Sequence, residues 1–268
     1  MKKTLTLLTA ILSASVCAQA QLLYEPFNYT VGSNLGGQGG WTNVNTGDEV
    51  TVASGNLSVS GLASSTGNSV TFGGLGMDPA LVFPTNTSTL WYSFAISVTD
   101  LGALDTTGGY LAGFGQNITT FGATFWARVN GVGYDLGISK RTTTGDTVFT
   151  SSAFSLGSTV FVVGNYQYSA GAADDVANLW INPNSTDFAV GSAPAPTLTT
   201  TATGTDLTGI SRFFLRQDSI TETPTVIVDE LRIGSDWASV TPVPEPSTYA
   251  LLGLGGLALA LRRRFARK

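Results

Sequence analysis

Two stretches in the middle of the chain alternate between apolar and polar or small residues. Between positions 90 and 98 the even positions are Leu, Tyr, Phe, Ile and Val, and between 121 and 129 the odd positions are Phe, Ala, Phe, Ala and Val. Successive side chains of a strand point to opposite faces, so this period of two predicts β-strands with one buried face. The pattern and composition predict further strands at 56–60, 69–72, 110–114, 132–138, 159–168, 176–182, 210–217 and 225–233.

The spacing of these strands predicts an all-β fold. Clusters of Gly, Asn and Asp separate them, and residues 21–240 contain no long stretch of helical periodicity. About ten short strands joined by short turns are typical of a sandwich or a barrel. The connection from 182 to 205 is long and contains three prolines, which suits a crossing between two sheets.

The N-terminus predicts a cleavable export signal in residues 1–20. Two lysines follow Met1, an apolar run extends from Leu5 to Val16, and Ala18 and Ala20 form a small-x-small cleavage site. The run is too short for an ordinary membrane span. We therefore expect the Sec translocon and signal peptidase as partners. Lipid attachment at Cys17 is the alternative, although Val16 replaces the small residue that usually precedes such a cysteine.

The other end combines a proline motif, a short apolar stretch and a basic tail. Pro244, Glu245 and Pro246 precede an apolar run from Ala250 to Leu261. As a helix, residues 249–261 rise about 20 Å, so we expect a short transmembrane helix that snorkelling arginines help to span the membrane. The positive charge keeps the tail cytoplasmic and the body outside. The tail residues are Arg262, Arg263, Arg264, Arg267 and Lys268.

This order of elements resembles the PEP-CTERM sorting signal. In that family a membrane-embedded enzyme, the exosortase, recognises the Pro-Glu-Pro element and cuts near it. The resemblance covers residues 243–268, within an expected sorting region of 241–268. It implies a protein that is transiently anchored in the inner membrane and then reaches the cell surface or the extracellular space. A plain tail anchor behind a proline linker is the alternative.

Two segments of the body are similar to concanavalin A/laminin-G-like jelly rolls. Residues 161–183 read as a hairpin that turns through 171–175 and ends in Trp180, Asn182 and Pro183. Residues 226–234, with Asp229 and Glu230 in an apolar run, are similar to the closing strand of such domains. The resemblance implies that residues 21–240 form a jelly-roll-like antiparallel β-sandwich, flanked by the signal helix and the short transmembrane helix.

The composition of the body excludes several kinds of chemistry. The chain has no histidine, and its one cysteine, Cys17, lies in the signal segment. Disulfides, thiolate sites and histidine-based catalysis are therefore excluded from the mature protein. Residues 21–243 hold six basic and 17 acidic residues, a formal charge of −11. Such a body repels nucleic acid, so we expect no nucleic-acid partner.

The body also lacks familiar catalytic patterns. Its glutamates are Glu25, Glu49, Glu222 and Glu230, and none forms the closely spaced carboxylate pattern of jelly-roll glycosidases. A serine–lysine dyad would have to use Lys140. From these absences we predict a protein that is not an enzyme and has no cofactor.

Three aspartates are candidate calcium ligands. Asp174 and Asp175 fall in the predicted 171–175 turn, where aspartate also caps backbone amides. By strict alternation Asp229 shares a face with Ile227 and Leu231, and Glu230 points to the other face. The structural interpretation of Asp229 is an ion pair with Arg212, Arg216 or Arg232.

Two tryptophans are candidate platforms for a sugar ring. Trp91 and Trp126 fall on the more polar faces of their strands, whereas packing between sheets is the usual role of tryptophan in sandwiches. Two hypotheses for the body follow. The first is a non-catalytic structural or adhesive protein of the cell surface or extracellular matrix. The second is a lectin-like, carbohydrate-binding module, with calcium as a candidate cofactor and extracellular polysaccharide as a candidate partner.

Overall fold

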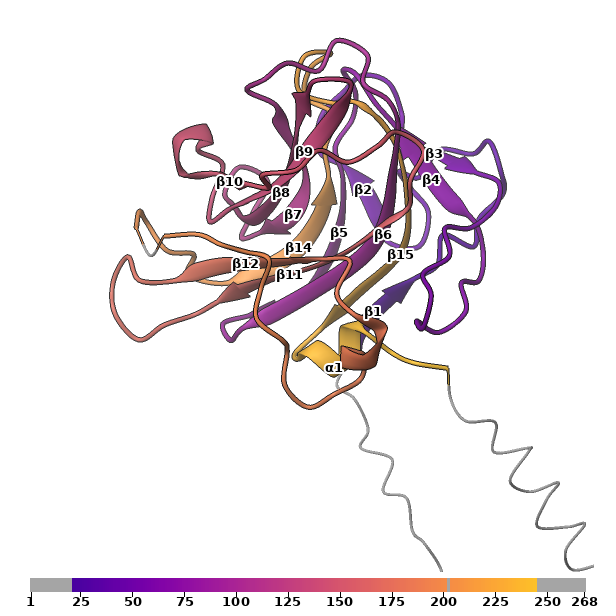
Figure 1. Cartoon of the computed structure of the whole chain (residues 1–268). Helices are drawn as coiled ribbons and strands as arrows, with labels where there is room; N and C mark the ends of the chain where they lie inside the picture. The colour runs from indigo at the N-terminus through magenta and orange to yellow at the C-terminus, as the bar shows by residue number, and fades with distance from the viewer. Residues whose placement is uncertain (1–20, 202, 245–268) are drawn as a thin grey trace, which may run out of the picture.

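The computed structural model describes residues 21–201 and 203–244, which form two antiparallel sheets packed face to face (Figure 1). The predicted all-β sandwich is confirmed. Predictions for the export signal, for Glu245 and Pro246, and for the apolar run and basic tail concern segments outside the described residues. Within the described residues, no helix is long and apolar enough to span a membrane.

We name the larger sheet sheet A. Its strand order is β13-β12-β11-β6-β15-β4-β3, and β1 also pairs with β15. The hairpin β11–β12 is the one predicted around the 171–175 turn. The strands are β1 (Gln21–Glu25), β3 (Thr51–Ala53), β4 (Ser69–Phe72), β6 (Leu90–Asp100), β11 (Val160–Gln167), β12 (Val176–Ile181), β13 (Leu198–Thr199) and β15 (Thr225–Gly234).

The second sheet, sheet B, has the order β10-β9-β8-β7-β14-β5-β2. The segment 182–205, predicted to cross between sheets, first returns to sheet A as β13, and the chain crosses to sheet B only between β13 and β14. The strands are β2 (Trp41–Asn43), β5 (Pro79–Asn86), β7 (Gly109–Gly115), β8 (Phe121–Asn130), β9 (Gly133–Ser139), β10 (Val148–Phe149) and β14 (Ile210–Leu215). Two 3₁₀ turns, η1 (Thr144–Asp146) and η2 (Ser185–Asp187), and one helix, α1 (Trp237–Val240), complete the described chain.

The inner faces of the two sheets enclose the main hydrophobic core. Phe94 of sheet A packs edge to face on Phe125 of sheet B, with ring centroids 5.3 Å apart. Tyr92 packs on Phe213 and donates a hydrogen bond from its hydroxyl to the Ala123 carbonyl at 3.0 Å, so it closes the gap between the sheets without an unpaired polar atom.

The outer face of sheet A carries a second, smaller core. Trp91, Trp180 and Trp237 pack together there, with ring centroids 5.0–6.0 Å apart. Helix α1 and the segments around Leu62 and Phe188 cover this cluster (Figure 1). The cover extends to the end of the described chain, because the Ala63 amide donates to the Pro242 carbonyl at 2.8 Å.

Most predicted strands are present, but the predicted strand 56–60 is wrong. That segment is a loop whose Leu57 amide donates to the Asp229 carboxylate at 2.8 Å instead of to a neighbouring strand. Strand β5 was not predicted. It contains Pro79 and Pro84, and proline is tolerated in a strand at its first residue and at irregular positions of the ladder. The pairing of β5 with β14 shifts register close to Pro84.

Two β-bulges overturn predictions that rested on strict alternation. Ala123 and Glu230 have positive φ values of 46° and 59°, and the strand pairings are irregular at both places. Ala123 and Phe125 face the core as predicted, but Phe121 packs on the outer face of sheet B, against Phe214. In β15 the bulge separates Asp229 from the face of Leu231 and Ile233, which belong to the core.

Candidate functional site

Sheet B presents an aromatic outer face. Tyr110 of β7, Phe121 and Trp126 of β8 and Phe214 of β14 form one continuous patch, with neighbouring ring centroids 4.6–6.0 Å apart. Trp126 is 3% exposed and donates from Nε1 to the Thr124 hydroxyl at 2.9 Å. Tyr110 and Phe121 are half-buried. Trp126 therefore supports the patch from below, and the other two rings reach solvent.

A polar hollow of about 250 Å³ lies over Tyr110 and Trp126. The β14–β15 connection supplies Arg216, Asp218 and Glu222 to its wall, and threonines from the β6–β7 and β9–β10 connections complete it. The lining residues are Thr107, Gly108, Tyr110, Trp126, Thr142, Thr144, Arg216, Asp218 and Glu222.

Arg216 is the central charged group of this hollow. Its guanidinium carbon lies 3.9 Å from the centroid of the Tyr110 ring, and its Nη2 is 2.7 Å from Asp218 Oδ1. Its Nη1 is buried without a hydrogen-bond partner among the described residues and is 3.6 Å from Glu222 Oε2. Stacking on Tyr110 and the ion pairs with Asp218 and Glu222 fix the guanidinium, and Nη1 keeps an N–H group without a hydrogen-bond partner among the described residues.

The protonation of the hollow differs from that of an exposed surface. Burial and the hydrogen bond with Asp218 raise the pKa of Glu222 against the opposing charge of Arg216. Burial also raises the pKa of Tyr110 to about 12, so this phenol stays neutral. Neutral tyrosine, a carboxyl group with a raised pKa and a fixed arginine together offer both hydrogen-bond donors and acceptors.

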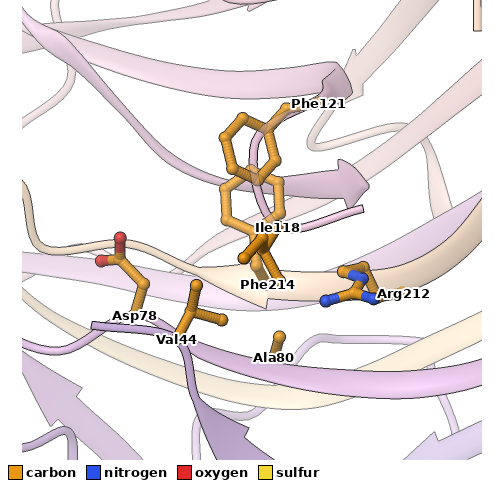
Figure 2. Close-up of a pocket in the computed structure, with 7 residues that line it drawn as sticks. All are labelled: Val44, Asp78, Ala80, Ile118, Phe121, Arg212 and Phe214. Atoms are coloured by element: carbon orange, nitrogen blue, oxygen red, sulfur yellow. The ribbon is translucent and has the colours of Figure 1, made fainter. Parts of the chain in front are cut away.

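A second, smaller cavity of about 20 Å³ opens on the same face. Phe121 and Phe214 line it, so it adjoins the aromatic patch (Figure 2). Figure 2 shows Asp78 and Arg212 on opposite sides of the cavity, with Ala80 below and the aromatic rings above. The patch therefore adjoins both a polar hollow and a smaller, mostly apolar cavity that Asp78 and Arg212 flank.

The two predicted platform tryptophans have different surroundings. Trp126 lines the hollow, whereas Trp91 belongs to the second core on sheet A. Tyr110, Phe121, Arg212 and Arg216 were not predicted as site residues. The cluster of aromatic and basic residues within β14 and just after it was the available signal, because alternation places Arg212, Phe214 and Arg216 on one face.

Two of the three predicted calcium ligands, Asp174 and Asp175, lie together, and the third, Asp229, does not join them. Asp174 and Asp175 meet Asp206, and one oxygen from each lies within 4.8 Å of the others. Lys140, which is buried, pairs with Asp206 and donates to the Gly204 carbonyl at 3.1 Å. Burial opposes ionisation of Asp206, but Lys140 and backbone amides outweigh it, so the pKa of Asp206 is lowered. Calcium binding here stays a prediction, and an ammonium group already neutralises part of the cluster.

Asp229 lies apart from that cluster, beneath the loop that follows β3. It is fully buried and accepts hydrogen bonds from the Leu57 and Glu230 amides at 2.8 and 2.7 Å. Burial raises the pKa of Asp229 to about 7, although the two amides lower it. The predicted ion pair with an arginine is wrong: Arg232 pairs with Glu230, and Asp229 has no salt bridge to any described residue.

Comparison with known proteins identifies the end of the chain. A PEP-CTERM protein-sorting motif matches residues 242–264. The motif implies an exported protein with an exosortase as its processing partner, as the resemblance predicted. No curated protein sequence matches the chain.

The body is similar in fold to solved β-sandwich proteins. An endo-β-1,4-glucuronan lyase from the fungus Trichoderma reesei has a TM-score of 0.50 and 14% identity, and the match covers 84% of this chain and 99% of the lyase. The alginate lyase vAL-1 from Chlorella virus has a TM-score of 0.41 and 12% identity over 76% of this chain and 99% of that one. The binding domain of botulinum neurotoxin serotype G has a TM-score of 0.41 and 9% identity over 75% and 45%.

The glucuronan lyase corrects the prediction that the protein is not an enzyme. Its fold is shared by this chain, which contradicts the exclusion of catalysis. The sequence-based exclusion of catalysis failed because it tested for only three catalytic patterns: paired glycosidase carboxylates, a Ser-His-Asp triad and a Ser-Lys dyad. A lyase belongs to another reaction class, and side chains such as tyrosine can also transfer protons. At this identity the likeness shows the fold, and the fold alone does not assign an activity.

Proposed function

We propose that the protein is an exported, exosortase-processed protein that binds a carbohydrate polymer on the outer face of sheet B. The observation that carries the proposal is the hollow in which Arg216, Asp218 and Glu222 stand over Tyr110 and Trp126. Sugars present hydroxyl groups around apolar C–H faces. A site for them combines converging charged or polar groups with aromatic rings, as this hollow does.

The unpartnered Nη1 of Arg216 supports a polar ligand in particular. A buried N–H group without a partner costs free energy, and a small movement of the guanidinium would bring it to a sugar hydroxyl or ring oxygen. Threonines on the opposite wall add hydroxyl groups that both donate and accept. The shared fold gives independent support, because the glucuronan lyase is a protein of this fold that acts on a polysaccharide.

The chain offers a matched pair of variants to test the proposal. Arg128 and Arg216 both pair with an aspartate and stand over an aromatic ring, at 4.1 and 3.9 Å, but Arg128 does not line the hollow. In affinity electrophoresis of the full chain against a panel of polysaccharides, we expect Arg216→Gln to weaken binding about tenfold. Arg128→Gln should bind as the wild type does. Loss of one charge-assisted hydrogen bond accounts for this difference.

Two outcomes would contradict the proposal. In the first, no polysaccharide of the panel retards the migration of the wild-type protein. In the second, Arg128→Gln and Arg216→Gln weaken binding equally. The same polymers should be incubated with the protein and assayed for new reducing ends and for the ultraviolet absorbance of unsaturated sugars. Hydrolysis produces new reducing ends without the absorbance, elimination produces both signals, and binding alone produces neither.

A further inference from the structure

Arg212 differs from every other basic side chain of the body. Arg128, Lys140, Arg216 and Arg232 each form a salt bridge with a carboxylate. Arg141 donates to the carbonyls of Phe121 and Thr205. Arg212 forms no salt bridge within the described residues, and its Nε is buried there without a hydrogen-bond partner.

This isolation is unusual for an arginine in so acidic a body. With 17 acidic residues between Glu25 and Asp236, partners are abundant, and an unsatisfied guanidinium N–H costs free energy. Asp78, across the cavity in Figure 2, is occupied elsewhere: it accepts hydrogen bonds from the Gln217 amide at 2.8 Å and from Asn45 Nδ2 at 3.1 Å. Arg212 is therefore held apart from the carboxylate that faces it.

The neighbouring strand makes room for Arg212. Arg212 pairs in register with Gly115 of β7 on one side and with Val82 of β5 on the other. A Cβ atom at position 115 would lie 2.8 Å from Arg212 Cγ, closer than side-chain contacts allow. Glycine at this position therefore lets the arginine lie along the sheet toward the cavity, with one N–H group unused.

The surroundings of Arg212 define the ligand chemistry. Val82 and Ile118, beside it, are 54% and 53% exposed, so an apolar rim borders the cation. A cavity of about 20 Å³ holds about one water-sized group. It can admit an oxygen of a carboxylate but not a sugar ring, and Asp78, which also lines it, disfavours an anion of higher charge such as sulfate carried on a dense polymer. Guanidinium binds planar carboxylates by two parallel hydrogen bonds.

We propose that Arg212 binds the carboxylate of an acidic sugar, a uronate unit of the polymer, while the C–H face of that unit rests on Val82 and Ile118. The inference rests on the proposed function, because Phe121, Phe214 and Tyr110 join this cavity to the hollow at Arg216. It deepens that function by specifying an anionic polymer. The overall charge of the body opposes such a ligand, so any preference for it must come from a local contact.

The test compares polymers that differ in one group. The full chain is titrated with polygalacturonate, with the same polymer after chemical reduction of its carboxyl groups, and with dextran sulfate. We expect the wild type to prefer polygalacturonate over its reduced form by about tenfold, as expected for one charge-assisted contact. Arg212→Gln should abolish that preference while still binding the reduced polymer. Arg128→Gln, with an arginine outside both cavities, should keep it.

The outcomes distinguish a failure of the carboxylate contact at Arg212 from a failure of carbohydrate binding itself. If the wild type binds both forms equally, or if Arg212→Gln keeps the preference, the carboxylate assignment is overturned and the sugar site stands. Stronger binding of dextran sulfate than of polygalacturonate also overturns the carboxylate assignment, because the site then binds polyanions according to their charge and does not select the carboxylate group. If neither form of the polymer nor any neutral polysaccharide binds, the sugar site itself fails. Thermal unfolding of each variant shows that the comparison concerns folded protein.

Discussion

The two outer faces of the sandwich carry similar aromatic side chains but differ in their cover. On sheet A, α1 and two long connections bury Trp180 and Trp237 in a second core and partly cover Trp91. On sheet B, the rings of Tyr110 and Phe121 remain half-exposed beside Arg212 and Arg216, each of which has a buried N–H group without a partner among the described residues. An outward aromatic residue is therefore structural or available to a ligand according to what the connections place over it.

The largest expected effect is on the covered face. Trp237 is 2% exposed and donates from Nε1 to the Asp187 carbonyl at 2.6 Å. Trp237→Ala should lower the free energy of unfolding by about 3–5 kcal/mol, because it removes a ring at the centre of the second core. Trp237→Phe, which loses only part of the packing and the hydrogen bond, should cost less. Urea unfolding measures both values, and equal stability of Trp237→Ala and the wild type would refute the second core.

The next effect is a pH dependence beneath the loop over sheet A. With a pKa of about 7 in the folded state and about 4 when unfolded, Asp229 keeps its proton only in the folded protein between those pH values. Its contribution to stability is therefore full below pH 4 and is lost as the pH rises to 7. Asp229→Asn does not titrate, so its free energy of unfolding relative to the wild type should rise by roughly 2–4 kcal/mol between pH 4 and pH 8. Its side-chain nitrogen cannot accept one of the two amide hydrogen bonds, which lowers its stability by an amount that does not depend on pH.

Denaturant unfolding across that pH range measures the difference. Asp146→Asn, at an exposed position of the β9–β10 connection, is the matched control and should follow the wild type. A wild type and an Asp229→Asn variant with parallel pH profiles would show that the carboxyl group ionises normally.

The smallest expected effect on stability lies on the open face. Phe121 is half-buried and packs at a tilt on Phe214, with ring centroids 4.6 Å apart, so Phe121→Ala should cost about 1–2 kcal/mol, less than Trp237→Ala. It should also weaken polysaccharide binding, whereas Trp237→Phe should leave binding unchanged. Calorimetry and affinity electrophoresis of both variants check the contrast. If Trp237→Phe weakens binding more than Phe121→Ala does, the division between the two faces is wrong.

The sequence predicted the sandwich because its long strands alternate, but it could not predict where alternation fails. Positive φ at Ala123 and Glu230 is uncommon for residues other than glycine, and neither position carries a local signal for it. The first bulge brings Phe121 to the ligand face, and the second separates Asp229 from the core face. The isolation of Arg212 was equally hidden, because composition gives the number of carboxylates but not which of them other residues occupy.

Strand β15 gives the arrangement a mechanical consequence. It is paired on both sides, with β6 and with β1 and β4. The chain that follows it is bonded to sheet A at Val240, through Ser93, and to the loop around Ala63 at Pro242. A pull on the C-terminal end would thus load several rows of backbone hydrogen bonds along their strands, and the ligand face on the opposite sheet would stay outside the path of the force. A protein held at this end could bear tension on a bound polymer without distorting the site that holds it.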